Sequence, residues 1–327
     1  MRSVATGWIL LAGVTTAQSP AVDELLRTGR FAEAEIRLRE TLRSSPGAET
    51  KAALAAALAG QFRWGDAEPL IADACARNPR KSQWWVLLAK CRFERGACEA
   101  AGEALDKALA LSPDADTLDA RAACAMQAGR PADAEPLLRR ALTASPSHVS
   151  ARVRLGRLLV DAGKHADALP HFDAALAVEP RHADALYFSA LCLRAEKRLE
   201  EALTRVDILF ADLPGHVGAA QLRASLLRSL GRKDAAALAW DSLRRLVAED
   251  DALAAELASL RIGVPDAARR RKAAARALAL GRFDLAAEQL RAAAAIDPRH
   301  PELAELASAL ERARGGIGAA SRPGATK

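Results

Sequence analysis

Residues 149–180 read VSARVRLGRLLVDAGKHADALPHFDAALAVEP, and this stretch contains the pattern that decides the fold. Apolar and small residues recur three or four positions apart in each half. Leu155 and Leu159 do so in the first half, and Ala168 and Phe172 in the second. This spacing is typical of α-helices and not of strands, so the stretch predicts two short amphipathic helices.

The ends of both predicted helices are marked in the sequence. Gly163 separates the two halves, because glycine adopts the left-handed conformation that ends a helix without steric cost. Pro180 ends the second helix, because proline has no N–H to donate and disfavours helix at the residue before it. Neither helix can bury its apolar stripe alone, so the unit needs neighbours of the same kind.

The same unit recurs along the chain at a nearly fixed spacing. Its closing prolines lie at positions 46, 79, 113, 146, 180 and 214, which are 33 or 34 residues apart. Three more positions repeat with them: a small residue in the first helix, an alanine that opens the second helix, and a large apolar residue four places later. The small residues are Ala55, Ala89, Ala122, Gly156, Ala190 and Ala224; the alanines are Ala34, Ala67, Ala101, Ala134, Ala168, Ala202, Ala236 and Ala286; the large residues are Leu38, Ile71, Leu105, Leu138, Phe172, Val206, Trp240 and Leu290.

This pattern resembles the tetratricopeptide repeat family, whose unit has about 34 residues. Trp85 stands where that family often has a tryptophan, and the resemblance covers roughly residues 20–312. It implies an all-α fold: a right-handed superhelical solenoid of about eight antiparallel helix–turn–helix repeats, closed by a C-terminal capping helix. The composition suits closely packed helices, because half of the residues are hydrophobic, only 4% are aromatic and alanine is abundant.

The pattern also divides the chain into segments. Residues 20–248 contain seven predicted repeats, at 20–46, 48–79, 82–113, 115–146, 149–180, 183–214 and 217–248. Residues 249–266 break the pattern and are expected to form an extra helix and a linker, acting either as a hinge or as a packed element. An eighth repeat and the capping helix are expected in residues 267–312. Residues 313–327 have no apolar stripe and are expected to be disordered.

Residues 1–17 do not fit the repeat. Arg2 precedes a short apolar run from Trp8 to Val14, and small residues lead up to Ala17. This layout is typical of a secretory signal peptide cleaved after Ala17, and the run is shorter than the ~20 residues that span a bilayer. We therefore predict a periplasmic or secreted protein with no membrane span. A cytoplasmic location is the alternative, and free cysteines favour it mildly because an oxidising compartment disfavours them.

The cysteines and histidines show no spacing typical of metal ligands, so we expect no metal site. The five cysteines fall on apolar positions of the repeat and are expected to be buried thiols; they are Cys75, Cys91, Cys98, Cys124 and Cys192. Four histidines stand two residues after a closing proline, where they are expected to act as loop and cap residues before the next helix; they are His148, His182, His216 and His300.

Motifs for catalysis and cofactor binding are absent from the sequence. It contains no P-loop, G-x-G-x-x-G, H-E-x-x-H or G-x-S-x-G pattern. The leader, the linker and the tail are each too short to hold a catalytic domain. We therefore predict a protein that is not an enzyme and binds no cofactor.

In the tetratricopeptide repeat family the concave face of the superhelix is lined mainly by outward positions of the first helices, and the resemblance implies the same surface here. Repeat position places nine residues in this predicted partner-binding groove: Lys90, Phe93, Met126, Arg157, Asp161, Tyr187, Arg194, Gln221 and Arg228. Phe93, Met126 and Tyr187 are not needed by the core within a repeat and are expected to be exposed. Exposed apolar groups ringed by polar residues commonly mark partner sites.

Three of the nine, Arg157, Arg194 and Arg228, come from successive repeats and are predicted to form a basic row. Guanidinium groups at such a spacing suit carboxylates along an extended or helical peptide. The sequence therefore predicts a non-catalytic scaffold that binds a protein or peptide segment with acidic groups.

A second hypothesis is an accessory or assembly subunit of a cell-envelope complex that docks by its outer face. It depends on the run Arg269-Arg270-Arg271-Lys272, although such a run is more often a solvated helix start. The run has no interleaved aromatic residues, so nucleic acid is not an expected partner. The net charge of +6 favours anionic partners only slightly. The oligomeric state and the identity of the partner stay open.

Overall fold

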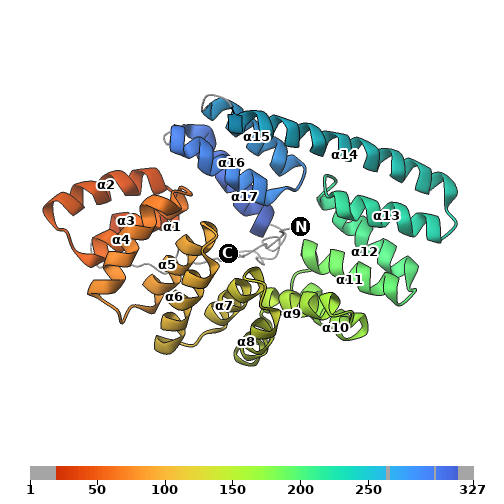
Figure 1. Cartoon of the computed structure of the whole chain (residues 1–327), viewed down its shortest axis with the longest axis horizontal. Helices are drawn as coiled ribbons and strands as arrows, with labels where there is room; N and C mark the ends of the chain where they lie inside the picture. Colours follow the sequence, from red (N-terminus) through yellow and green to blue (C-terminus); the bar gives the residue numbers. More distant parts are fainter. Residues whose placement is uncertain (1–19, 263–265, 298–299, 316–327) are drawn as a thin grey trace, which may run out of the picture. The chain divides into compact units, whose positions relative to one another are not determined.

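The computed structural model describes residues 20–262, 266–297 and 300–315, which form seventeen α-helices and no strand (Figure 1). The predicted all-α helical-repeat fold is therefore confirmed. The chain divides into two compact units, Met1–Pro146 and Ser147–Lys327, called here the N-terminal unit and the C-terminal unit. Each unit is described by itself.

The N-terminal unit consists of four helical hairpins in chain order. Its helices are α1 (Pro20–Arg27), α2 (Phe31–Ser44), α3 (Ala48–Gly60), α4 (Trp64–Arg77), α5 (Ser82–Glu94), α6 (Cys98–Leu111), α7 (Ala115–Gln127) and α8 (Pro131–Ala144). Each second helix packs against its own first helix, and α2, α4 and α6 also pack against the first helix of the next hairpin. This double packing buries the apolar stripes that a single hairpin leaves open.

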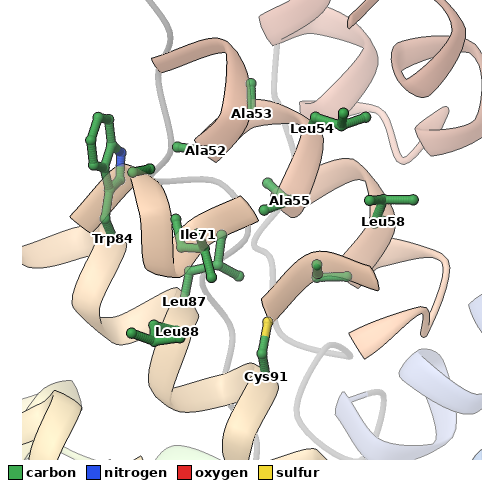
Figure 2. Packing of buried hydrophobic residues seen from close by; sticks show 14 of the residues in the cluster. Ala52, Ala53, Leu54, Ala55, Leu58, Ile71, Trp84, Leu87, Leu88 and Cys91 are labelled. Atoms are coloured by element: carbon green, nitrogen blue, oxygen red, sulfur yellow. The ribbon is translucent and has the colours of Figure 1, made fainter. Parts of the chain in front are cut away.

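The core of the N-terminal unit is built mainly from small side chains. Every residue from Ala52 to Ala59 in α3 is buried. Figure 2 shows Ala55 of α3 and Ile71 of α4 beside Leu87 of α5. Alanine favours helix and keeps side chains short, so the three helices approach closely without bulky groups between them.

The C-terminal unit begins with three hairpins of the same kind and ends differently. Its helices are α9 (Val149–Asp161), α10 (His165–Val178), α11 (Ala183–Ala195), α12 (Leu199–Asp212), α13 (Val217–Ser229), α14 (Lys233–Ile262), α15 (Ala267–Ala279), α16 (Phe283–Ile296) and α17 (Pro301–Gly315). Gly163 has a positive φ of 74°, as a left-handed turn requires. In the next hairpin Lys197 adopts the same conformation at 63°, which costs a non-glycine residue about 1–2 kcal/mol.

The helix α14 does not follow the predicted boundaries. It is one continuous helix of 30 residues, whereas the second helix α12 has 14. The helix expected as a separate element in residues 249–266 is the second half of α14. No glycine or proline interrupts residues 233–262, and Leu253, Leu257 and Leu260 are buried at helical spacing. The repeat pattern stops at position 248, but nothing there ends the helix.

The long α14 supports two other helices, α13 on one half and α15 on the other (Figure 1). Two ion pairs fasten its second half to the last hairpin: Arg276 to Glu256 at 2.6 Å, and Arg282 to Asp250 at 2.9 Å. The C-terminal end of α15 meets the loop before α13, because a Cβ built on Gly215 would lie 2.5 Å from the carbonyl oxygen of Ala279. Along α14, the end of α15 therefore lies next to the start of α13.

The last helix, α17, packs against both α15 and α16 and occupies the place of the predicted capping helix. The predicted leader, residues 1–17, lies outside the described residues, and so does the predicted tail beyond Gly315. Among the residues that the structure describes, no helix combines the length and the apolar character needed to cross a bilayer.

Candidate partner-binding surface

The nine predicted groove residues are divided between the two units. In the N-terminal unit, α5 carries Lys90 and Phe93, and α7 carries Met126. Phe93 is only 7% exposed and belongs to the core, so its predicted exposure is wrong. A long side chain leans away from its own Cα along the helix, and repeat position alone did not show where the ring goes. Met126 is half-buried. Lys90 is half-buried too, with its ammonium 5.5 Å from the ring centre of Trp64.

The other six residues lie on the first helices of three successive hairpins in the C-terminal unit. We call them the first-helix surface: Arg157 and Asp161 of α9, Tyr187 and Arg194 of α11, and Gln221 and Arg228 of α13. The middle helix, α11, contacts both α9 and α13. Arg157 and Tyr187 are half-buried, and the other four residues are exposed.

Aromatic rings connect the three helices of this surface. The guanidinium of Arg157 lies 5.8 Å from the ring centre of Phe188 in α11. The neighbouring Tyr187 packs edge-on against Phe188 at 5.4 Å and lies 5.2 Å from the ring of His216, at the start of α13. Each such contact contributes about 0.5–1.5 kcal/mol. The rings therefore fix the relative positions of α9, α11 and α13.

The exposed arginines of the surface differ from many other arginines of the unit. Arg205 and Arg223, for example, each form an ion pair at 2.6 Å with an aspartate of another helix. Arg194 and Arg228 have no carboxylate partner among the described residues, although Arg228 stacks over Trp240 at 5.8 Å. Their guanidinium N–H groups are therefore available to an external acceptor.

Tyr187 is a half-buried polar group of the surface. Burial raises the pKa of its phenol, while the nearby Arg194 lowers it by a smaller amount. The phenol is therefore neutral at physiological pH and can both donate and accept a hydrogen bond. A half-buried ring with a polar end suits contact with a partner, because its apolar part is already held in place.

Three histidines begin the first helices of this unit, and their predicted capping role is confirmed. Nδ1 of His148 accepts a hydrogen bond from the backbone N–H of Ala151 at 3.2 Å. His182 and His216 cap α11 and α13 in the same way, over 3.3 and 3.0 Å. Each imidazole replaces the Ser, Thr, Asp or Asn that usually satisfies the first N–H groups of a helix.

The cysteines behave as buried apolar residues. Four are buried, and Cys98 is half-buried. Burial raises the pKa of Cys75 and of Cys91 to about 12, and that of Cys192 to about 11, so these thiols are uncharged and unreactive near neutral pH. Within the described part of the chain, no group of three or more His, Cys, Asp or Glu side chains is arranged to hold a metal ion.

The basic run at the start of α15 is engaged inside its own unit. Arg269 donates to Ser259 Oγ at 2.9 Å, Arg270 to Gln289 Oε1 at 3.1 Å, and Arg271 to Glu302 Oε2 at 2.9 Å. These bonds join α15 to α14, α16 and α17. Three of the four basic side chains therefore hold the last helices of the unit together, and they do not form a freely exposed charged patch.

Sequence reasoning missed two aromatic residues beside the surface, Phe188 and Trp240. Trp240 occupies the position that holds a fully buried residue in other repeats, such as Phe172 at 0% exposure, yet it is only partly buried. Its size was the available signal, because every other repeat has a smaller residue at that position. Phe188 gave no signal beyond its place next to Tyr187.

Two models of the tetratricopeptide repeat match the sequence. One matches residues 52–116 and 153–207, and the other matches residues 125–168. The chain belongs to the tetratricopeptide repeat family. No protein of curated function matches its sequence significantly.

Solved structures similar to this tetratricopeptide repeat protein share its fold at low identity. The structure described as pilF of Pseudomonas aeruginosa is 19% identical with a TM-score of 0.58, over 63% of this chain and 94% of that chain. The Cut9–Hcn1 hetero-tetramer of the APC/C is 16% identical with a TM-score of 0.50, over 89% and 48%. At these identities the likeness concerns the fold alone.

Proposed function

We propose that this tetratricopeptide repeat protein is a non-catalytic scaffold that binds a peptide or protein segment with acidic groups on the first-helix surface of its C-terminal unit. The fold itself supports a role in protein–protein interaction. The finer proposal depends on one observation: Tyr187 is held half-buried between helices that also present Arg194 and Arg228, neither of which has a carboxylate partner in the described part of the chain.

The energetics of such a surface favour a few strong contacts. A rigid aromatic ring loses little conformational freedom on binding, and Tyr and Arg are enriched among the residues that dominate interface energies. A carboxylate that reaches Arg194 or Arg228 forms a charge-assisted hydrogen bond, which is roughly twice as strong as a neutral one. Acidic groups near the tyrosine contact therefore define the expected ligand.

The test uses labelled peptides of about twelve residues that differ only in their number of glutamates, with binding followed by fluorescence anisotropy. Affinity is expected to rise with glutamate content and to fall at least tenfold in Arg194→Glu, because truncating or reversing a contact arginine commonly costs more than about 1.4 kcal/mol. Arg245→Glu is the matched control, since it makes the same charge change on the exposed side of α14.

Equal loss of affinity in the two variants would show that net charge, and not this surface, governs binding. Circular dichroism must show unchanged helicity in both variants, since Arg194 and Arg245 are exposed. Binding that does not depend on the glutamates would remove the acidic ligand from the proposal.

We also propose that the protein is exported and loses residues 1–17, on the sequence evidence alone. Intact mass after expression in the native host, together with cell fractionation, tests this. A mass without those residues in a periplasmic or secreted fraction is the expected result, whereas a full-length mass in the cytosol contradicts it.

The alternative of a cell-envelope subunit that docks by its outer face has less support. It depended on the basic run of α15, and Arg269, Arg270 and Arg271 are bonded within the unit. We therefore place the partner on the first-helix surface.

A further inference from the structure

His216 lies where three elements of the C-terminal unit meet. Its Nδ1 accepts the hydrogen bond from Ala219 N–H that caps α13. Its ring is 5.2 Å from that of Tyr187 in α11. The residue before it, Gly215, is packed against the backbone of α15.

This cap exists only while Nδ1 is unprotonated, because a protonated imidazole has no acceptor. A positive charge at the start of α13 is also unfavourable, since the helix dipole places a partial positive charge there. Protonation of His216 therefore removes one stabilising contact and adds one repulsive interaction at the same helix end.

The surroundings of His216 make this protonation structurally costly. Burial lowers the pKa of the imidazole and is the main cause of the shift. Asp184 of α11 opposes that shift, and Arg282, just before α16, adds to it. The phenol of Tyr187, whose ring contacts that of His216, is neutral in this range because burial raises its pKa. Acid must therefore break the cap in order to charge His216.

We propose that His216 makes ligand binding by the first-helix surface pH-dependent, with protonation releasing the start of α13, withdrawing the support of Tyr187 and weakening the binding of acidic segments. This inference rests on the proposed function of that surface. Tyr187 connects the start of α13 to the binding surface, because its hydroxyl packs against the first turn of that helix. A methyl group added at Gly218, in that turn, would lie 3.0 Å from the tyrosine hydroxyl oxygen. When that turn loosens, the phenol loses its support.

The direction of the effect follows from the pKa of His216, which is lower in the folded protein than the ordinary value of about 6.5. The unfolded or uncapped state then binds more protons than the capped state as the pH falls. The contribution of the cap is therefore complete above about pH 6.5 and is lost as the pH falls through the pKa of His216. Peptide carboxylates titrate near pH 4 and stay charged in this window.

The experiment measures the affinity of the full chain for the glutamate-rich labelled peptide at about pH 7.5 and about pH 5.5. Wild-type affinity is expected to fall about fivefold, the equilibrium equivalent of one helix cap. His216→Asn should hold its affinity, because asparagine is a good N-cap that does not titrate. His216→Ala should bind weakly at both pH values, as the uncapped protein does.

A matched control comes from the first capping histidine. His148→Asn makes the same change at the start of α9 instead of α13, and it should keep the wild-type pH dependence. Hydrogen exchange of the Ala219 amide adds a readout that ligand charge does not affect. In the wild type, exchange of this amide should accelerate in acid relative to the other amides. In His216→Asn it should not.

Each outcome decides a different point. Binding that is present but equal or tighter in acid overturns the inference and leaves the proposed function standing. A pH response that survives in His216→Asn assigns the effect to another group and also overturns the inference. Absence of peptide binding by the wild type at both pH values overturns the proposed function, and the inference falls with it.

Discussion

The N-terminal and C-terminal units share one repeat pattern but fill it with different side chains. At equivalent positions the N-terminal unit has Ala122 and Leu138, and the C-terminal unit has Gly156 and Phe172. A Cβ built on Gly156 would lie 2.7 Å from Phe172 Cζ, so the glycine is what admits the ring. Two helices can thus approach closely in two ways. Either both contribute side chains of small or moderate size, as in the N-terminal unit, or one contributes a large ring and the other a glycine, as in the C-terminal unit.

The helix starts of the two units differ as well. In the N-terminal unit α7 is capped by Asp114, while Gly47 and Lys81 precede α3 and α5 without a side-chain cap. In the C-terminal unit α9, α11 and α13 all begin with a histidine cap. Because burial lowers the pKa of His216, mild acid should weaken the C-terminal unit at the start of α13.

The largest effect is expected from Phe172→Ala, which should lower the free energy of unfolding of the C-terminal unit by about 3–5 kcal/mol. The ring is fully buried, and its removal leaves a cavity. Hydrogen exchange by mass spectrometry resolves the two units, and amides of α9 to α12 should lose protection. Ile208→Ala, at a side chain 38% exposed, is the control and should cost under about 1 kcal/mol.

Gly156→Ala should cost the C-terminal unit about 1–3 kcal/mol, because its new methyl group overlaps the Phe172 ring. Adding Phe172→Leu recreates the pair found at Ala122 and Leu138 and should recover most of that loss. A double-mutant cycle by chemical denaturation measures the coupling. Strict additivity of the two changes would show that the two positions do not share volume.

Removing one cap in each unit should cost about 0.5–2 kcal/mol at neutral pH. Asp114→Ala removes the cap of α7, and His216→Ala removes that of α13. Because burial lowers the pKa of His216 in the folded protein, the stability that its cap contributes is lost as the pH falls, so His216→Ala should approach the wild type in mild acid, whereas Asp114→Ala should not. Thermal midpoints of the two variants across pH 5.5 to 7.5 give the comparison, and parallel curves would contradict it.

The smallest effect concerns thiol reactivity, where four of the five cysteines lie in the N-terminal unit. Half-buried Cys98 should react first with a thiol reagent at neutral pH, and buried Cys75 and Cys91 only on unfolding. Because folding raises the pKa of these two thiols to about 12, their contribution to stability is present below about pH 8.5 and is lost as the pH rises toward 12. Mass spectrometry after brief labelling checks the order of reaction.

The sequence predicted the helices well because the apolar periodicity and the turn residues indicate the same helix boundaries. Alanines at fixed spacing, turn glycines and closing prolines all describe the same hairpin, and the capping histidines follow from their distance to those prolines. The end of α14 could not be predicted in the same way. The repeat pattern reports where neighbouring hairpins touch, whereas a helix ends only where its backbone hydrogen bonds are interrupted.

The candidate site was only partly predictable. Repeat position identified Tyr187 and Arg194 on α11 and Arg228 on α13, since that depends on backbone geometry alone. It failed for Phe93, because the direction of a long side chain depends on the space around it. The contact of Tyr187 with His216 was not foreseeable either, since it joins two hairpins and depends on how closely they pack.

The unbroken α14 has a consequence for insertions and deletions. A loop absorbs a changed length, but a helix converts each residue into about 100° of rotation and about 1.5 Å of advance. One residue lost between Val247 and Leu253 would therefore turn the last hairpin to another side of α14 and separate Gly215 from Leu280. Two whole turns added, about seven residues, would nearly restore the side of α14 on which the hairpin packs, but they would move the hairpin about 10 Å away from α13. This segment should therefore tolerate few changes of length.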